Sequence, residues 1–173
     1  RKNGETCEKT NTFLVVDECF GEFLDEPEAY SVIPFLEKLS HVFVLKAFTK
    51  IYAMAGLRLG YALCSNEDVL TKICQVRQPW SVSGLAQRAG IAALKETEYV
   101  LKTRKLVHEQ RKKMEAALTE LGYIVYPSQA NYIFFKGPEE LFDFCLRKRI
   151  LIRDCSNFRT LTKGFYRICI RSQ

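Results

Sequence analysis

Short apolar runs alternate with amphipathic segments along the first part of the chain. Three runs rich in β-branched and apolar side chains predict buried strands, and Asp17 stands at the tip of the first. These strands are residues 12–17, 41–45 and 56–64, the last beginning with a glycine-rich turn. One segment with helical spacing, residues 30–39, lies between the first and second strands, and two more, residues 65–76 and 83–96, follow the third strand. Strands alternating with helices predict a mostly parallel α/β sheet.

The pattern changes in the second part of the chain. Residues 98–121 form a long amphipathic stretch that stops at Gly122, which predicts a helix with a glycine at its C-terminal end. After it come four short strand-like runs and one helical segment. The strands are residues 123–126, 131–135, 150–153 and 165–171, and the helix is 139–148. This order predicts a smaller α+β unit joined by the long helix.

Composition and charge exclude several classes of protein. The chain is 47% hydrophobic and 27% charged, which is typical of a globular protein. Its apolar runs are only a few residues long, so no membrane span is expected. Seven scattered cysteines without a CxxC motif argue against a metal site and indicate free thiols in a reducing cytosol. The net charge of +6 suits an enzyme for anionic substrates as well as a nucleic-acid binder.

The segment from Ala47 to Tyr61, AFTKIYAMAGLRLGY, holds the densest chemical signal. It resembles the lysine segment of pyridoxal-phosphate enzymes of the class I/II aminotransferase family, in which a Ser/Thr-Lys pair precedes Gly-Leu-Arg-x-Gly. The resemblance implies that Lys50 forms the Schiff base with the cofactor, that Arg58 binds its phosphate and that Thr49 adds a hydroxyl contact. A lysine amine condenses with an aldehyde, and a guanidinium offers a planar fork to phosphate.

Two positions in the cofactor motifs depart from the usual family pattern. The family usually has Ser or Thr three residues before the lysine, whereas this chain has Ala47. In the family a strand-end carboxylate keeps the pyridine nitrogen protonated, and Asp17 matches it. Three residues after that Asp, most members carry a Tyr that bonds the ring oxygen, whereas this chain has Phe20. The resemblance therefore leaves Phe20 a packing role at the cofactor.

Two arginines in the last strands match the substrate-binding positions of the family. By the resemblance, Arg167 in Tyr-Arg-Ile binds the α-carboxylate of the substrate in a bidentate manner. Arg153, in the run Arg-Asp-Cys-Ser-Asn, matches an arginine that contacts a substrate phosphate in the branch that handles phosphorylated amino acids. Without the resemblance, either residue is equally well an exposed arginine on an edge strand.

Three features narrow the branch: Phe20, the run QPWSVS at 78–83 and the run RDCSN at 153–157. Together they resemble threonine-phosphate decarboxylases of cobalamin biosynthesis, with histidinol-phosphate aminotransferases as the close alternative. The implied reaction is loss of CO2 from L-threonine O-3-phosphate to give aminopropanol phosphate.

The resemblance covers nearly the whole chain but only half of a family member. It implies the C-terminal part of the three-layer αβα large domain at residues 1–96 and the small α+β C-terminal domain at residues 97–173. Family members are about twice as long and usually dimeric, so we expect the C-terminal half of a cytoplasmic homodimeric enzyme, inactive by itself.

Two further classes of function stay open. Basic clusters at 104–105, 111–113 and 147–149 are compatible with nucleic-acid binding, although acids between them on the long helix are typical of a solvated face. A degenerate relative that keeps the fold as an assembly subunit is the other alternative. We expect no nucleic acid and no membrane among the partners.

Overall fold

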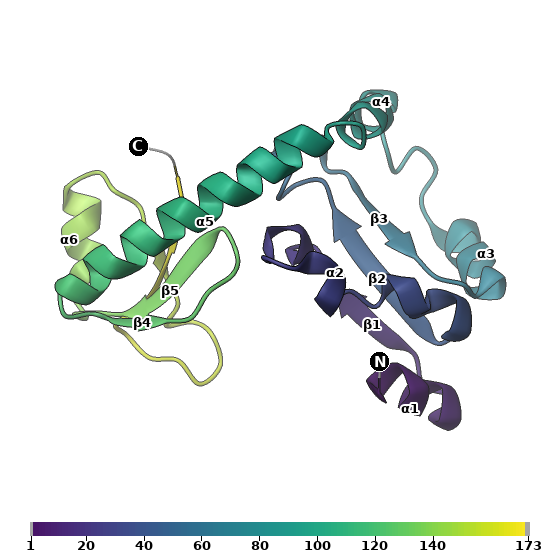
Figure 1. Ribbon diagram of the computed structural model, residues 1–173, viewed down its shortest axis with the longest axis horizontal. Coiled ribbons are helices and arrows are strands. Elements are labelled where there is room, and N and C mark those ends of the chain that lie inside the picture. Colours follow the sequence, from purple (N-terminus) through teal and green to yellow (C-terminus); the bar gives the residue numbers. More distant parts are fainter. Residues whose placement is uncertain (1, 172–173) are drawn as a thin grey trace. The chain divides into compact units, whose positions relative to one another are not determined.

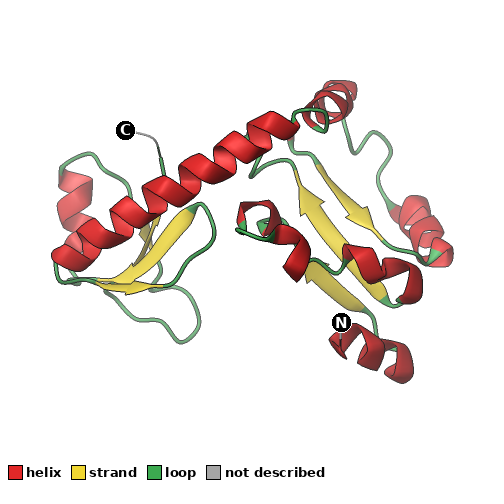
Figure 2. Ribbon diagram, viewed as in Figure 1, coloured by secondary structure: helices red, strands yellow, loops and turns green. Residues whose placement is uncertain are grey.

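The computed structural model describes residues 2–171 and divides into two compact units, residues 1–101 and 102–173, with the division inside helix α5. The strands form two sheets, one of three strands in the first unit and one of four in the second (Figure 2). This agrees with the predicted α/β organisation followed by an α+β unit. No helix within the described residues is long and apolar enough to cross a membrane.

The first unit is built around the sheet β1-β2-β3 (Figure 1). Its strands are β1 (Leu14–Asp17), β2 (Val42–Ala47) and β3 (Gly60–Leu63). Its α-helices are α1 (Lys2–Thr10), α2 (Pro27–Tyr30), α3 (Glu67–Val76) and α4 (Gly84–Ala93). Short 3₁₀ helices are η1 (Gly21–Phe23), η2 (Ile33–Lys38) and η3 (Ala55–Leu57).

The three-stranded sheet is mixed rather than wholly parallel. β1 and β2 run parallel, with Asp17 opposite Leu45, whereas β3 returns antiparallel to β2. The connection between β2 and β3 contains only a 3₁₀ turn, whereas parallel strands are usually joined by an α-helix that crosses over the sheet. One face packs on η2 through Leu36, Leu39, Val42 and Val44. Val15 on the other face is 58% exposed, so β1 is half-buried and not fully buried as predicted.

Two N-terminal helices differ from the sequence prediction. The helical spacing at 30–39 corresponds to the 3₁₀ helix η2, which has Pro34 in its first turn and extends for only six residues. The N-terminal helix α1 was not predicted, because it lacks an apolar stripe. Gly4 gives α1 its contact instead, since a Cβ there would lie 2.9 Å from Leu39 Cδ1.

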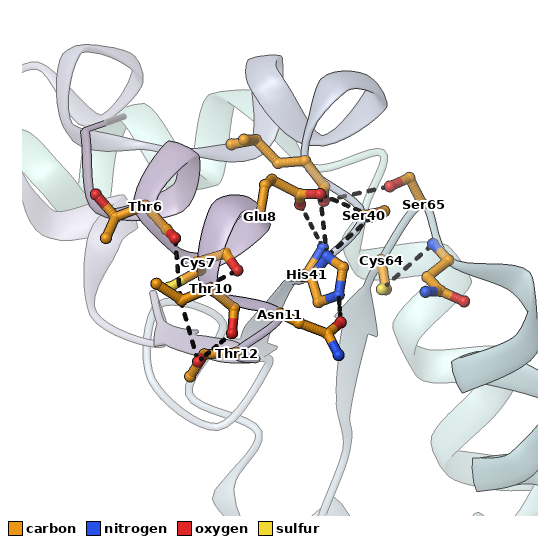
Figure 3. A network of polar contacts seen from close by, with 12 residues as sticks. Thr6, Cys7, Glu8, Thr10, Asn11, Thr12, Ser40, His41, Cys64 and Ser65 are labelled. Atoms are coloured by element: carbon orange, nitrogen blue, oxygen red, sulfur yellow. Dashed lines mark hydrogen bonds and ion pairs between the residues drawn. The ribbon is translucent and has the colours of Figure 1, made fainter.

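A polar network fastens α1 to the start of β2 (Figure 3). The backbone N–H of His41 donates to Glu8 Oε1 at 2.6 Å, and the Ser40 hydroxyl donates to Glu8 Oε2 at 2.9 Å. The His41 ring joins Glu8 Oε2 through Nδ1 at 3.0 Å and Asn11 Oδ1 through Nε2 at 2.8 Å. These bonds from His41 hold the pKa of Glu8 below its usual value, so this carboxylate is charged at neutral pH.

The second unit packs α5 (Thr97–Glu120) and α6 (Leu141–Arg147) with the sheet β4-β5-β7-β6. The strands are β4 (Ile124–Tyr126), β5 (Tyr132–Lys136), β6 (Arg153–Asp154) and β7 (Phe165–Cys169). As predicted, α5 ends before Gly122, which has a φ of 80°. The predicted strand at 150–153 is shorter and later, because Arg149 turns the chain with a φ of 61°.

Candidate active site

The C-terminal ends of β1 and β2 meet at one edge of the first sheet. Asp17 pairs with Leu45, and Lys50 follows five residues after Leu45 along the chain. In parallel strands these ends lie side by side, and ligands of α/β proteins bind beyond them. The topology therefore brings the predicted carboxylate and the predicted lysine to a common edge.

Asp17 presents an ionised carboxylate at this edge. The backbone N–H of Cys19 donates to Asp17 Oδ1 at 2.9 Å. Hydrogen bonds from Cys19, assisted by the positive charge of Lys50, hold the pKa of Asp17 below its usual value. An exposed carboxylate of this kind is suited to pair with a protonated ring nitrogen.

Lys50 lies beside Phe20, which belongs to the turn after β1. Its Nζ atom is 5.1 Å from the centroid of the Phe20 ring, which is a cation–π distance. The flanking residues Phe48 and Ile51 are 4% and 1% exposed, so buried anchors fix the backbone on both sides of an exposed lysine. The structure therefore gathers Asp17, Phe20 and Lys50, with Phe20 in a packing position.

The loop from Thr49 to Arg58 holds its shape by unusual backbone angles. Ala53 and Arg58 have φ values of 55° and 53°, in the left-handed region that residues with a Cβ seldom adopt. Such strain is concentrated at functional sites. Arg58 is exposed, and its Nη1 donates to the Ala55 carbonyl at 3.3 Å, while Thr49 is half-buried.

Gly56 and Gly60 of the predicted motif have different roles. A Cβ at Gly60 would lie 3.0 Å from the carbonyl oxygen of Lys46, so the close approach of β3 to β2 requires glycine. A Cβ at Gly56 would have no neighbour within 4 Å. Of these two glycines, Gly60 is therefore the one whose missing side chain the strand packing needs.

A charged cluster joins β2 to the turn after β1, and it was not predicted from the sequence. Lys46 Nζ lies 2.7 Å from Glu22 Oε1 and 3.7 Å from Glu18 Oε2. The side chains of Lys46 and Glu18 are each only 9% exposed. The available signal was the register of β2, where Lys46 continues the inward positions of Val42 and Val44.

Arg153 and Arg167 form the second group of predicted site residues. They are register partners on β6 and β7, which places both side chains on one face of the second sheet. Arg167 stacks on Tyr132 with its guanidinium carbon 4.8 Å from the ring centroid. Arg153 Nη2 donates to Asn157 Oδ1 at 2.8 Å, and its guanidinium lies 5.4 Å from the Phe158 ring.

A pocket of about 410 Å³ opens beside Arg167. Among the described residues of the wall, Arg167 is the one charged side chain, and most of the others are aromatic or small. The lining residues are Tyr126, Pro127, Ser128, Gln129, Ala130, Tyr132, Phe134, Cys155, Phe158, Leu161 and Arg167. A cation in an apolar wall suits a small anionic group.

The two basic clusters on α5 have the structure of ordinary helix surface and core. Lys105 and Glu109 are 4.0 Å apart on one face of α5, with the lysine side chain 79% exposed. Arg111 from the second cluster is 4% exposed and donates to the Ala130 carbonyl at 3.3 Å. A buried arginine offers no charge to a phosphate backbone, which weakens the nucleic-acid alternative.

Comparison with known proteins places this chain in a family. The model of "Aminotransferase class I and II" matches residues 2–173. The chain belongs to the class I and II aminotransferase family. Members of this family are pyridoxal-phosphate-dependent enzymes, including decarboxylases and aminotransferases.

Curated relatives of this aminotransferase-family chain fall in two groups. The histidinol-phosphate aminotransferase of Oleidesulfovibrio alaskensis is 40% identical over 86% of the chain and 40% of its own length. The threonine-phosphate decarboxylase of Salmonella typhimurium is 36% identical over 97% of the chain and 47% of its own length. The chain thus spans about half the length of the curated relatives it matches.

Solved structures that resemble this chain include proteins with each of these two names. The histidinol-phosphate aminotransferase from Clostridium acetobutylicum superposes with a TM-score of 0.93 at 30% identity, over 99% of this chain and 53% of that one. The L-threonine-O-3-phosphate decarboxylase from Porphyromonas gingivalis gives 0.80 at 26%, over 95% and 52%. The fold is therefore that of class I and II aminotransferases, common to both activities.

The predicted cofactor residues of the first unit fit the family cofactor in charge and chemistry. Asp17 offers an anion for a ring nitrogen, Lys50 an exposed amine for an aldehyde, and Arg58 a guanidinium for a phosphate. Within residues 2–171 no group of three or more His, Cys, Asp or Glu is arranged to hold a metal ion. All seven cysteines are free thiols.

Proposed function

We propose that the chain is the C-terminal half of a pyridoxal-phosphate-dependent decarboxylase that converts L-threonine O-3-phosphate to aminopropanol phosphate. The observation that carries the substrate class is the cross-strand pair Arg153–Arg167, because two guanidinium groups on one face suit a substrate with a carboxylate and a phosphate. The threonine-phosphate decarboxylase that matches 97% of the chain supports the same substrate.

In this proposal each side chain has a defined role. When bound, pyridoxal phosphate supplies the electron sink for the bond broken at the substrate Cα. Asp17 holds a proton at the ring nitrogen, and Arg58 with Thr49 binds the cofactor phosphate. Lys50 binds the cofactor aldehyde and returns a proton to Cα. Arg167 orients the carboxylate and Arg153 the phosphate, while Phe20 packs beside Lys50.

The run from Asp154 to Asn157 supports a role for Arg153. The carboxylate of Asp154 accepts the Ser156 backbone N–H at 2.9 Å and the Ser156 hydroxyl at 3.0 Å. This turn brings Asn157 back to Arg153, so that the amide orients the guanidinium. The run RDCSN at residues 153–157 thus holds the guanidinium of Arg153 in place to bind an anion.

The proposal includes the organisation of the whole enzyme. Residues 1–96 would complete a large cofactor-binding domain and residues 97–173 form a small domain. The active form would be a homodimer of chains as long as the relatives, located in the cytoplasm. Histidinol-phosphate aminotransferase is the second candidate, favoured by the TM-score of 0.93 to a structure of that name.

The deciding experiment measures CO2 release from L-threonine O-3-phosphate by the full-length enzyme loaded with pyridoxal phosphate. We expect the unmodified enzyme to release CO2 and the Lys50→Ala variant to release none. Lys105→Ala, at an exposed position on α5, is the control that retains it. Glutamate formation from histidinol phosphate and 2-oxoglutarate, without CO2 release, would replace the decarboxylase with the aminotransferase. If the protein fails to take up the cofactor and catalyses neither reaction, the result would favour a degenerate relative that keeps only the fold.

A further inference from the structure

Two lysines stand near the end of β2, and their surroundings differ sharply. Lys50 is exposed beside Phe20, whereas the side chain of Lys46 is 9% exposed and faces the η2 side of the sheet. Lys46 lies 2.7 Å from Glu22 Oε1 and 3.7 Å from Glu18 Oε2. Although burial opposes its charge, these carboxylates raise the pKa of Lys46 above its usual value. A protonated, paired amine is not a nucleophile.

The partners of Lys46 bracket the turn that carries two site residues. Glu18 directly follows Asp17, and Glu22 stands two residues after Phe20. A Cβ at Gly21, between Phe20 and Glu22, would lie only 3.8 Å from Lys46 Nζ, so the turn passes closely over the ammonium group. Lys46 therefore contacts this turn on both sides of Phe20.

Glu18 connects the cluster to the next segment. Its Oε2 accepts from the Ser31 hydroxyl at 2.9 Å, and its Oε1 accepts from the Val32 backbone N–H at 2.8 Å. The carboxylate thus ties the end of β1 to the entry of η2, while Lys46 ties it to β2. Further titratable groups facing Lys46 are Tyr61, Tyr52 and Cys19.

We propose that Lys46 is a positioning residue, which clamps the turn of residues 17–22 through Glu18 and Glu22 so that Asp17 and Phe20 stay aligned with Lys50. The inference rests on the proposed cofactor chemistry of Lys50. A buried ion pair adds little net stability compared with apolar side chains of similar size. A positional role explains why a charged cluster occupies this inward register.

The test uses the full-length enzyme with four substitutions. Lys46→Met and Glu22→Gln remove one side of the 2.7 Å contact, Lys46→Arg keeps the charge, and Lys105→Met removes an exposed lysine of α5 as the matched control. The readouts are the rate at which the visible absorbance band appears when pyridoxal phosphate is added, and the pH midpoint of that band. Thermal denaturation checks each fold.

We expect Lys46→Met and Glu22→Gln to slow band formation roughly tenfold or more and to move its pH midpoint, because misplacement by about 1 Å has effects up to about a hundredfold. Lys46→Arg should keep the rate of band formation and the pH midpoint close to those of the unmodified enzyme, and Lys105→Met should change neither. Normal rates and midpoints in Lys46→Met would overturn the clamp. If Lys46→Met does not fold, Glu22→Gln decides, since Glu22 is partly exposed. Absence of the band in the unmodified enzyme would instead refute the proposed function.

Discussion

Arg153 and Arg167 stand directly opposite each other on the antiparallel strands β6 and β7. Like charges in this position repel, by about 0.2–1 kcal/mol in typical sheets. Each guanidinium has its own partner, Asn157 for Arg153 and the Tyr132 ring for Arg167. This arrangement opposes stability but concentrates positive charge, which suits the substrate proposed above, with its carboxylate and its phosphate.

Substitutions at this pair should separate binding from stability. Arg167→Lys keeps the charge but loses the planar fork, so we expect KM for the substrate to rise about tenfold or more. Arg153→Gln should also raise KM, and it should leave the free energy of unfolding unchanged or increase it by up to about 1 kcal/mol. Enzyme kinetics measure KM and urea denaturation measures stability. Arg159→Gln, at an exposed position between β6 and β7, is the control. A large loss of stability with normal KM would show a structural role instead.

Two glycines on α4 should respond differently to alanine. A Cβ at Gly90 would lie 2.5 Å from Leu59 Cδ2 and 3.6 Å from Phe48 Cζ, and both residues are buried. We expect Gly90→Ala to lower the free energy of unfolding by about 1 kcal/mol or more. Gly84→Ala, with no neighbour within 4 Å, should be neutral or slightly stabilising. Equal urea midpoints for the two variants would contradict this packing of α4.

The thiol beside Asp17 should be unreactive. Burial and the hydrogen bond and negative charge of Asp17 raise the pKa of Cys19 to about 11. Because the thiolate is the reactive form, iodoacetamide at pH 8 should label Cys19 roughly tenfold or more slowly than the exposed Cys74. Asp17→Asn should speed labelling of Cys19 and leave Cys74 unchanged, as measured by mass spectrometry. Equal rates at both cysteines would contradict the geometry.

Acid should release the N-terminal helix from β2. Since the folded-state pKa of Glu8 is lowered, its stabilising effect is present above its ordinary pKa of 4.5 and is lost as pH falls through the folded value. Glu8→Gln should therefore lower the Tm at pH 7, and its melting curve should converge with that of the unmodified protein at low pH. Glu28→Gln, on the exposed surface of α2, is the control. A difference that persists unchanged in acid would rule out the ionised carboxylate as the cause.

The elements that position the candidate site follow from local sequence signals. A run of apolar residues ending in an acid predicted that β1 ends at Asp17, and the glycine-rich run after Lys50 predicted a turn before β3. Asn66 and Ser83 cap α3 and α4, where a side chain in each accepts an N-terminal backbone N–H. These features depend on neighbours in the chain.

Features that depend on distant contacts could not be predicted in the same way. Helix α1 has no apolar stripe and is fixed by Glu8 to His41, more than thirty residues away. The predicted second strand ended at Leu45, so it left out Lys46, whose inward register on β2 pairs it with Glu18 and Glu22. The pairing of Arg153 with Arg167 depends on the register of β6. This strand begins later than predicted, because Arg149 turns the chain before it.

The most direct test of the account is to identify the lysine that binds the cofactor. The full-length enzyme is incubated with pyridoxal phosphate, reduced with borohydride and mapped by mass spectrometry. We expect the pyridoxyl group on the peptide that carries Lys50, and its loss in Lys50→Ala. A pyridoxyl group on Lys46 or on another lysine, or none in the unmodified enzyme, would contradict the assignment of this site.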